Sequence, residues 1–193
     1  MTEFLPLIGF VFFGLFSPGP NVVLLTASGA RFGFWRTVPH ILGVAFGVGI
    51  TSGITALGVG TLLQAQPALT LVLKIVATAW ILWMAYTLWR ADPAKTQAGG
   101  RPFTFFEAVL FQWVNPKVWA VALSAMAYVP ALTPYGQATA LAATFSGLNL
   151  GVCLFWTTAG ALLAYLLTNP TAWCIFMRGM ALALGVFSLL VFL

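Results

Sequence analysis

The sequence predicts an all-α integral membrane protein in which six transmembrane helices form two inverted three-helix repeats. Three observations predict this fold. Of the 193 residues, 61% are apolar and 6% are charged, whereas about a quarter of the residues in a soluble domain are charged. Six apolar runs reach the length of about 20 residues that a membrane helix needs. The first and fourth runs are interrupted by proline motifs at similar distances from the starts of the two halves.

The apolar runs occupy nearly the whole chain, so we expect a single transmembrane domain and no soluble domain. A polar linker at residues 91–103 separates a first repeat at about 4–90 from a second at about 104–193. Because three spans precede the linker, the second repeat crosses the membrane in the opposite sense to the first. The expected spans are residues 4–27, 38–63, 68–89, 104–129, 138–167 and 171–193.

Basic residues gather in alternate connections between the expected spans. The second and fourth connections, residues 64–67 and 130–137, contain no Lys or Arg. By the positive-inside rule, the odd connections, including the linker, are cytoplasmic and both termini are outside. Cytoplasmic anchoring explains most of the net charge of +5, so no nucleic-acid partner is expected. The basic residues in or near the odd connections are Arg31, Arg36, Arg90, Lys95, Arg101 and Arg178.

The first apolar run is broken by the motif Ser17-Pro18-Gly19-Pro20-Asn21. Its two prolines remove backbone donors within a stretch of three residues, and the glycine between them relaxes the backbone, so a regular helix cannot continue. Unwound backbone at membrane depth is tolerated only inside protein or beside water. Interrupted helices in corresponding positions of two halves indicate the binding site of a transporter.

The fourth run is broken at Asn115-Pro116-Lys117, where the proline frees a carbonyl near Gln112. The spacing of Gln112, Asn115 and Trp119 would place them on one helical face. A charge near the bilayer centre costs about 2.5–3.5 kcal/mol, so Lys117 is a functional candidate, with snorkelling toward an interface as the alternative. We expect the substrate site to comprise Pro18, Gly19, Pro20, Asn21, Gln112, Asn115, Pro116, Lys117 and Asn149.

Few groups are available to carry a coupling proton. Glu107 is the acidic candidate, although an acid in a first helical turn also caps a helix N-terminus. The single histidine, His40, lies at the cytoplasmic start of the second span and belongs to the residue type that titrates near physiological pH. An interfacial polar anchor is the alternative for His40. Lys117 completes the set of proton-coupling candidates.

Several other functions lack the residues that they require. One histidine and two separated cysteines, Cys153 and Cys174, do not form a metal site. No span pairs a serine with a histidine, and an aspartyl pair is absent, so we expect no enzyme. A phosphate-binding G-x-x-x-x-G-K-[ST] loop is also missing, so no cofactor is expected and transport would be secondary. The alternative is a passive channel or a membrane scaffold protein whose prolines only kink its helices.

The motifs resemble those of a known family. Ser17-Pro18-Gly19-Pro20-Asn21 and Asn115-Pro116-Lys117 are accompanied by a small-residue series and by an aromatic lead-in to the second motif. With them the chain resembles, over most of its length, the LysE/RhtB family of bacterial amino-acid exporters, which includes lysine, homoserine-threonine and cysteine-type efflux proteins. The small residues are Gly29, Gly33, Gly43 and Gly47, and the lead-in is Phe111-Gln112-Trp113.

The resemblance implies a multi-pass protein of the bacterial inner membrane that exports amino acids or closely related small metabolites, by proton-coupled antiport with alternating access. Many members carry an aspartate where this chain has Asn21. If that acid carries the proton in the family, this chain must use Glu107, Lys117 or His40, or be coupled differently.

Small neutral amino acids are the favoured substrates, because the expected cavity has few fixed charges and several aromatic neighbours. Helix N-terminal donors or Lys117 would bind the substrate carboxylate, and freed carbonyls its ammonium group. Each half also carries a G-x-x-x-G sequence, Gly43 to Gly47 and Gly147 to Gly151, a spacing that lets helices approach closely in lipid. These faces fit a homodimer and packing within one subunit equally well. The aromatic neighbours are Phe111, Trp113, Trp119 and Trp156.

Overall fold

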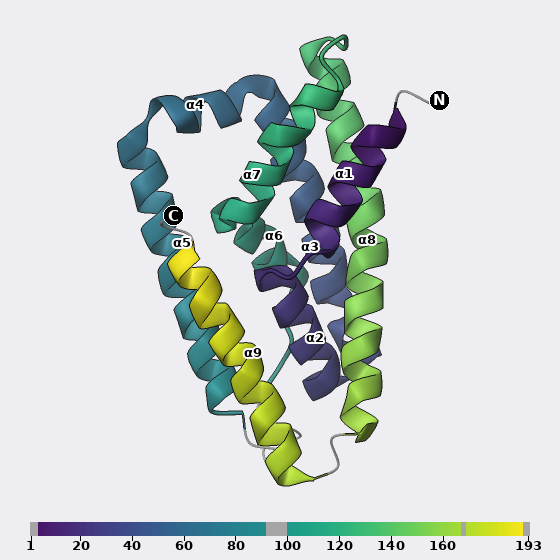
Figure 1. The fold of residues 1–193 in the computed structure, drawn as a ribbon, viewed down its shortest axis with the longest axis vertical. Coiled ribbons are helices and arrows are strands. Elements are labelled where there is room, and N and C mark those ends of the chain that lie inside the picture. The colour runs from purple at the N-terminus through teal and green to yellow at the C-terminus, as the bar shows by residue number, and fades with distance from the viewer. Residues whose placement is uncertain (1–3, 92–99, 167–168, 191–193) are drawn as a thin grey trace.

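A computed structural model describes residues 4–91, 100–166 and 169–190, which are mainly helical and contain no strand (Figure 1). Most of the expected cytoplasmic linker, including Lys95, lies outside the described residues. The helices are α1 (Leu5–Phe16), α2 (Pro20–Phe32), α3 (Phe34–Ile54), α4 (Gly60–Ala65), α5 (Pro67–Trp89), α6 (Phe105–Val114), α7 (Pro116–Ala125), α8 (Pro134–Leu166) and α9 (Pro170–Leu190).

Both predicted interruptions are present, since α1 and α2 are separated at 17–19 and α6 and α7 at Asn115. Four helical segments are long and apolar enough to cross a membrane: Phe34–Val59, α5, α8 and α9. A fifth candidate is the pair α1 and α2, taken as one span bent by 58°. The helices α6 and α7 have 10 residues each, and neither is long enough to span alone. The six-span arrangement therefore remains a prediction.

The second span ends earlier than the sequence predicted. Its helix continues through a π-helical turn at Thr55–Val59, inside which Gly58 has a φ of 101°. That conformation is one that glycine adopts readily and L-residues rarely do. The short helix α4 then runs across the end of the molecule to α5 (Figure 1). Hydropathy alone did not find this turn, because the apolar run continues to residue 63.

Helix α3 is the central span, with 67% of its best apolar window buried, against 22% for α5 and 28% for α9. It packs against α8 on one side and α6 on the other, while α2 packs on α8 and α5 on α9. Glycines permit two of these close approaches. A Cβ on Gly43 would overlap the carbonyl oxygen of Phe105, and one on Gly29 would overlap that of Thr157.

The second G-x-x-x-G sequence does not pack in the same way as the first. A Cβ on Gly147 or Gly151 would meet no heavy atom of the described residues within 4 Å. By contrast, a Cβ on Gly47 would lie 2.9 Å from the Cα of Val109 on α6. The two sequences share a spacing but not an environment, because α8 turns Gly147 and Gly151 outward.

Buried apolar side chains form two clusters. One joins α1, α3, α7 and α8 and includes Leu7, Val44, Ala122 and Phe145. The other joins α2, α5, α6 and α9 and includes residues such as Ile81. Helices α2 and α6 also contribute Leu25 and Ala108 to the first cluster. These two helices therefore connect the peripheral pair α5 and α9 to the rest of the molecule, and both carry residues of the expected site.

Candidate functional site

The first break is shaped by its two prolines. Helix α1 ends at Phe16, and Ser17, with a ψ of 145°, leads the chain out of the helix. Pro20 takes the first position of α2, where a residue without an N–H loses no intrahelical bond. The carbonyls of Ser17 and Pro18 are consequently left outside either helix and need another partner.

Lys117, from the second break, supplies that partner. Its Nζ donates to the carbonyl oxygens of Ser17 and Pro18 and to Ser17 Oγ, at 2.5–3.2 Å. A Cβ on Gly19 would lie 2.9 Å from both Cδ and Nζ of Lys117, so the absence of a side chain at Gly19 makes room for the lysine. Lys117 therefore joins the two breaks, a contact that the sequence did not predict.

At the second break, side chains form hydrogen bonds with backbone groups next to the interruption. Asn115 Oδ1 accepts a hydrogen bond from the backbone N–H of Lys117 at 3.2 Å and so caps α7. Trp119 Nε1 donates to the Trp113 carbonyl at 2.8 Å. Because α6 ends at Val114, Gln112 and Trp119 do not share one continuous helical face, contrary to the spacing argument.

An amide pair makes the second link between the breaks. Asn21 Nδ2 donates to Gln112 Oε1 at 2.8 Å, and Gln112 Nε2 donates back to Asn21 Oδ1 at 3.2 Å. Gln112 Nε2 also donates to the Ala108 carbonyl at 2.9 Å. The Gln112 side chain is fully buried, and its polar atoms are paired. The break on α1 and α2 is therefore tied to α6 as well as to α7.

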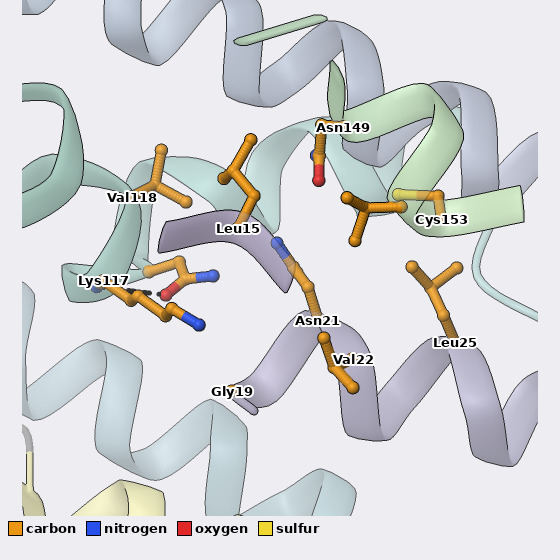
Figure 2. A pocket seen from close by; sticks show the side chains of 11 residues that line it. Leu15, Gly19, Asn21, Val22, Leu25, Lys117, Val118, Asn149 and Cys153 are labelled. Atoms are coloured by element: carbon orange, nitrogen blue, oxygen red, sulfur yellow. Dashed lines mark hydrogen bonds between the residues drawn. The ribbon is translucent and has the colours of Figure 1, made fainter. Parts of the chain in front are cut away.

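A cavity of about 20 Å³, which we call the central cavity, lies between the breaks (Figure 2). Such a volume holds about one water molecule and is too small for an amino acid. Buried Asn149 points toward this cavity from α8, and its Nδ2 has no partner among the described residues. The expected site residues that line the central cavity are Gly19, Asn21, Asn115, Lys117 and Asn149.

The other expected residues act around the central cavity without lining it. Pro18, Pro20 and Pro116 shape the helix ends, and Gln112 contacts the lining only through Asn21. Sequence reasoning missed Ser17 as a site residue, although it lies within the first motif. It also missed the apolar walls, Leu15, Val22, Leu25, Val118, Val152 and Cys153, which no motif marks.

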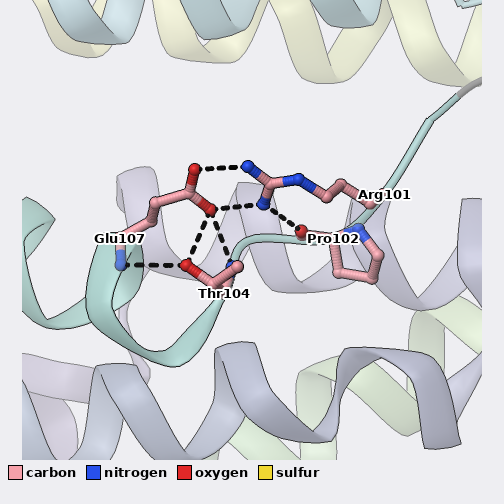
Figure 3. Close-up of polar contacts among 4 residues, drawn as sticks. All are labelled: Arg101, Pro102, Thr104 and Glu107. Carbon is pink, nitrogen blue, oxygen red and sulfur yellow. Dashed lines mark hydrogen bonds and ion pairs between the residues drawn. The ribbon is translucent and has the colours of Figure 1, made fainter.

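Glu107 caps α6, as the alternative interpretation predicted. Thr104 Oγ1 accepts from the Glu107 N–H, and the Glu107 carboxylate accepts from the Thr104 N–H (Figure 3), which is a capping box. Arg101 also donates to both carboxylate oxygens, at 2.6 and 2.7 Å. The carboxylate raises the pKa of Arg101 through a hydrogen bond and charge attraction. These contacts all favour ionised Glu107.

His40 is buried, so its interpretation as an interfacial anchor is wrong. Only 2% of the residue is exposed, and its ring lies 5.1 Å from the ring of Phe103, measured between centroids. Both ring nitrogens lack a hydrogen-bond partner among the described residues. The segment before α6 covers His40, a tertiary contact that its place at the start of a span does not indicate.

His40 belongs to a second and larger cavity, the end cavity, of about 420 Å³. It lies among α2, the start of α3, α5 and the segment that leads into α6. Glu107 also lines it, so two of the three proton-coupling candidates lie here and only Lys117 lies at the central cavity. Other residues that line the end cavity are Ser28, Arg31, Trp80, Trp83, Arg101 and Phe103. Within the described residues no group of three or more His, Cys, Asp or Glu is placed to hold a metal ion.

The sequence of this chain is similar to those of several known proteins. The chain matches 30% of 110 aligned residues of a cysteine/O-acetylserine efflux protein from Klebsiella pneumoniae, over 57% of this chain and 56% of that protein. The chain thus spans little more than half of that relative's length in the match. A homoserine/homoserine lactone efflux protein from Salmonella typhimurium is 26% identical over 163 residues, covering 80% of this chain and 78% of its own.

A cysteine/O-acetylserine efflux protein from Salmonella typhimurium is 26% identical over 110 residues, 57% of this chain and 56% of the relative. No solved structure matches the chain. The model of the LysE type translocator family matches residues 12–193, a range that includes both helix breaks and both cavities. The chain therefore belongs to the LysE type translocator family.

Proposed function

We propose that this protein is a secondary active exporter of small neutral amino acids or closely related metabolites. The observation that carries the proposal is the pair of broken helices joined by Lys117 and by the Asn21–Gln112 amide pair beside a small cavity with apolar walls and a few polar groups. Freed carbonyls and helix N-termini are the groups that transporters present to the two ends of a zwitterion. Cysteine, O-acetylserine and homoserine, which appear in the relatives' names, fit the neutral class expected from the sequence, whereas homoserine lactone, also named there, has no carboxylate.

The pattern of helix contacts supports an inverted repeat over about 4–90 and 104–193. If the two halves are exchanged in chain order, α1 corresponds to α6 and α2 to α7, so the contact of α2 with α8 corresponds to that of α7 with α3, and the contact of α1 with α8 to that of α6 with α3. The contact of α3 with α8 joins equivalent helices of the two halves, and so does the contact of α5 with α9, so the exchange leaves both contacts unchanged. Two halves related in this way can rock against each other and open the central cavity to each side in turn.

The central cavity suggests how a substrate is admitted. Lys117 occupies the carbonyls of Ser17 and Pro18, which are the acceptors that a substrate ammonium group needs. We infer that the substrate displaces the lysine, that its ammonium group takes these carbonyls, and that Lys117 pairs with its carboxylate. The cavity of about 20 Å³ would then be the closed state of the site, and opening it requires the two halves to separate.

Proton-coupled antiport is the second part of the proposal. Of the three candidates, Lys117 is the one that lines the central cavity, so its charge can respond directly to substrate. Glu107 is held in its ionised form by Arg101 and Thr104, which argues for a structural role. His40 stays a candidate because it is buried without a partner among the described residues.

We further propose a bacterial inner-membrane location with both termini outside. In Figure 1 α2 and α5 end, and α9 begins, at the lower end of the molecule, and the chain rises from there to the start of α6. That end therefore carries the connections rich in basic residues and would face the cytoplasm. A homodimer stays a proposal that the outward-facing Gly147 and Gly151 permit.

The test is efflux from bacteria loaded with amino acids by dipeptide feeding, with the medium analysed over time. We expect selective release of one or a few neutral amino acids, lost in Asn115→Ala and Pro20→Ala while both variants still insert in the membrane. Normal release by these variants would contradict the proposal. Export against a concentration gradient separates an exporter from a passive channel, which cannot move solute uphill, and from a scaffold protein, which moves none.

A further inference from the structure

We propose that the end cavity is a second binding site, which takes up a small amino acid by its carboxylate and ammonium groups before the amino acid reaches the central cavity. This inference rests on the proposed export function, and it concerns residues that no motif marks. The end cavity has a volume of about 420 Å³, within the range of small-molecule sites, whereas the central cavity holds about 20 Å³.

The lining of the end cavity contains polar atoms that lack partners. His40 Nδ1 and Nε2, Trp80 Nε1 and Arg31 Nε are all buried and have no hydrogen bond among the described residues. Buried polar groups are normally paired, since leaving one unpaired costs about 1–3 kcal/mol. The three residues, from α2, α3 and α5, surround one cavity, and a polar ligand there would pair with these nitrogens once the neighbouring side chains that cover them move aside.

The charges of the lining favour a carboxylate. Arg31 and Arg101 are basic and Glu107 is acidic, and the last two form an ion pair with each other. Arg31 makes no ion pair with any described residue; its guanidinium lies over the ring of Phe32 at 4.8 Å. A guanidinium matches a carboxylate with two parallel hydrogen bonds, and Trp80 Nε1 is a further donor.

The ammonium group of the amino acid has an acceptor in the same cavity. Glu107 Oε2 already accepts from Arg101 and from two groups of Thr104, whereas Oε1 accepts only from Arg101 among the described residues. A carboxylate oxygen has two lone pairs, so Oε1 keeps room for one more donor. The rings of Trp80 and Phe103 line the remainder of the cavity and suit an apolar side chain.

The end cavity and the central cavity lie along the same helix. Asn21 lines the central cavity and Ser28 the end cavity, and both lie on α2, so about 10 Å of helix separates them. Phe111 is fully buried and lines neither cavity, with its ring 5.9 Å from that of Trp80 and 6.4 Å from that of Phe103. Arg31 lies ten residues after Asn21, so an amino acid bound there would be about 15 Å along α2 from the first helix break.

Equilibrium binding of radiolabelled L-threonine to the full chain in lipid nanodiscs tests this inference. The measurement uses the Asn115→Ala background, so that binding at the central cavity does not contribute. L-Threoninamide, which has no carboxylate, is the matched competitor. We expect threoninamide to compete about tenfold more weakly than threonine or worse, as the loss of a charge-assisted hydrogen bond predicts.

Substitutions of Arg31 then test whether threonine binds in the end cavity. Arg31→Gln should remove the preference for threonine over threoninamide, and Arg31→Lys should keep part of it. Arg36→Gln is the control, because Arg36 lies over the same Phe32 ring at 5.7 Å but does not line the end cavity. Size-exclusion chromatography checks that each variant is folded.

No threonine binding, equal competition by threoninamide, or a preference that survives Arg31→Gln would overturn the inference. The comparison of threonine with threoninamide needs no substitution at Arg31, so a misfolded variant does not leave the question open. The export function is judged separately, by whether Asn115→Ala abolishes efflux, and either proposal can fail without the other.

Discussion

The polar groups around the two cavities differ in whether they have hydrogen-bond partners. Around the central cavity Lys117, Asn21 and Gln112 pair with one another or with freed backbone, and about 20 Å³ of space remains. Around the end cavity, nitrogens of Arg31, His40 and Trp80 have no hydrogen-bond partner among the described residues, and about 420 Å³ remains. Under the proposed function, the difference teaches that one site is closed by hydrogen bonds between its own groups, while the other keeps space for a ligand.

The largest expected effect comes from removing the ammonium that closes the central cavity. Lys117→Met leaves the Ser17 and Pro18 carbonyls without the ammonium that donates to them, and it removes the group proposed to bind the substrate carboxylate. We expect efflux to fall to background, while Lys117→Arg keeps partial efflux because its guanidinium still donates. The dipeptide-loading efflux assay measures both variants, with membrane content determined by immunoblot.

Efflux at the normal rate in Lys117→Met would show that the pairing at the breaks is structural only. Loss of the protein from the membrane would instead show that this lysine is required for folding. Insertion is therefore quantified before transport is compared.

The next effect is steric and concerns the same contact. In Gly19→Ala the added Cβ would lie 2.9 Å from Lys117 Nζ, so the lysine must shift away from the carbonyls. We expect efflux to drop severalfold, with folding preserved because the contact is with the far end of a flexible side chain. Gly9→Ala in α1 is the matched control, since a Cβ there meets nothing of the described residues within 4 Å. Equal efflux from the two variants would contradict a specific role for Gly19.

The amide pair gives a smaller expected change. Gln112→Leu removes both hydrogen bonds with Asn21 and fills similar space, leaving the Asn21 amide unpaired at a cost of about 1–3 kcal/mol. We expect a lower thermal midpoint in detergent and slower efflux, and we expect Asn21→Leu combined with Gln112→Leu to recover part of the stability. A double variant that is no more stable than Gln112→Leu alone would contradict the pairing.

The smallest expected effects are on stability and on the pH dependence of efflux, and they concern Glu107 at the end cavity. Glu107→Gln weakens an exposed ion pair, worth about 0–1 kcal/mol, and part of the capping box with Thr104. We expect a modest loss of stability and an unchanged dependence of efflux on pH, because Arg101 and Thr104 already hold the carboxylate ionised. Loss of the pH dependence would instead identify Glu107 as the proton carrier and shift the coupling from the central to the end cavity.

The sequence located the helix breaks correctly because their cause is local. Proline has no N–H and clashes with the preceding turn, and the helix is interrupted at Pro18, Pro20 and Pro116, although α3 continues through its single Pro39. The same is true of the cap formed by Thr104 and Glu107, which depends on residues three apart. Composition alone likewise predicted helices long and apolar enough to cross a membrane, since so few charged side chains are present.

Only the tertiary structure decided which groups meet. Lys117 and Ser17 are 100 residues apart, and Asn21 and Gln112 are 91 apart, so no periodicity or spacing brings them together. His40 is buried because Phe103, from the segment before another helix, covers it. The end cavity exists because α2, α3 and α5 are held apart there, and the outward direction of Gly147 depends on where α8 lies. Local chemistry fixes where the backbone breaks, but the packing of distant helices fixes which side chains complete the site.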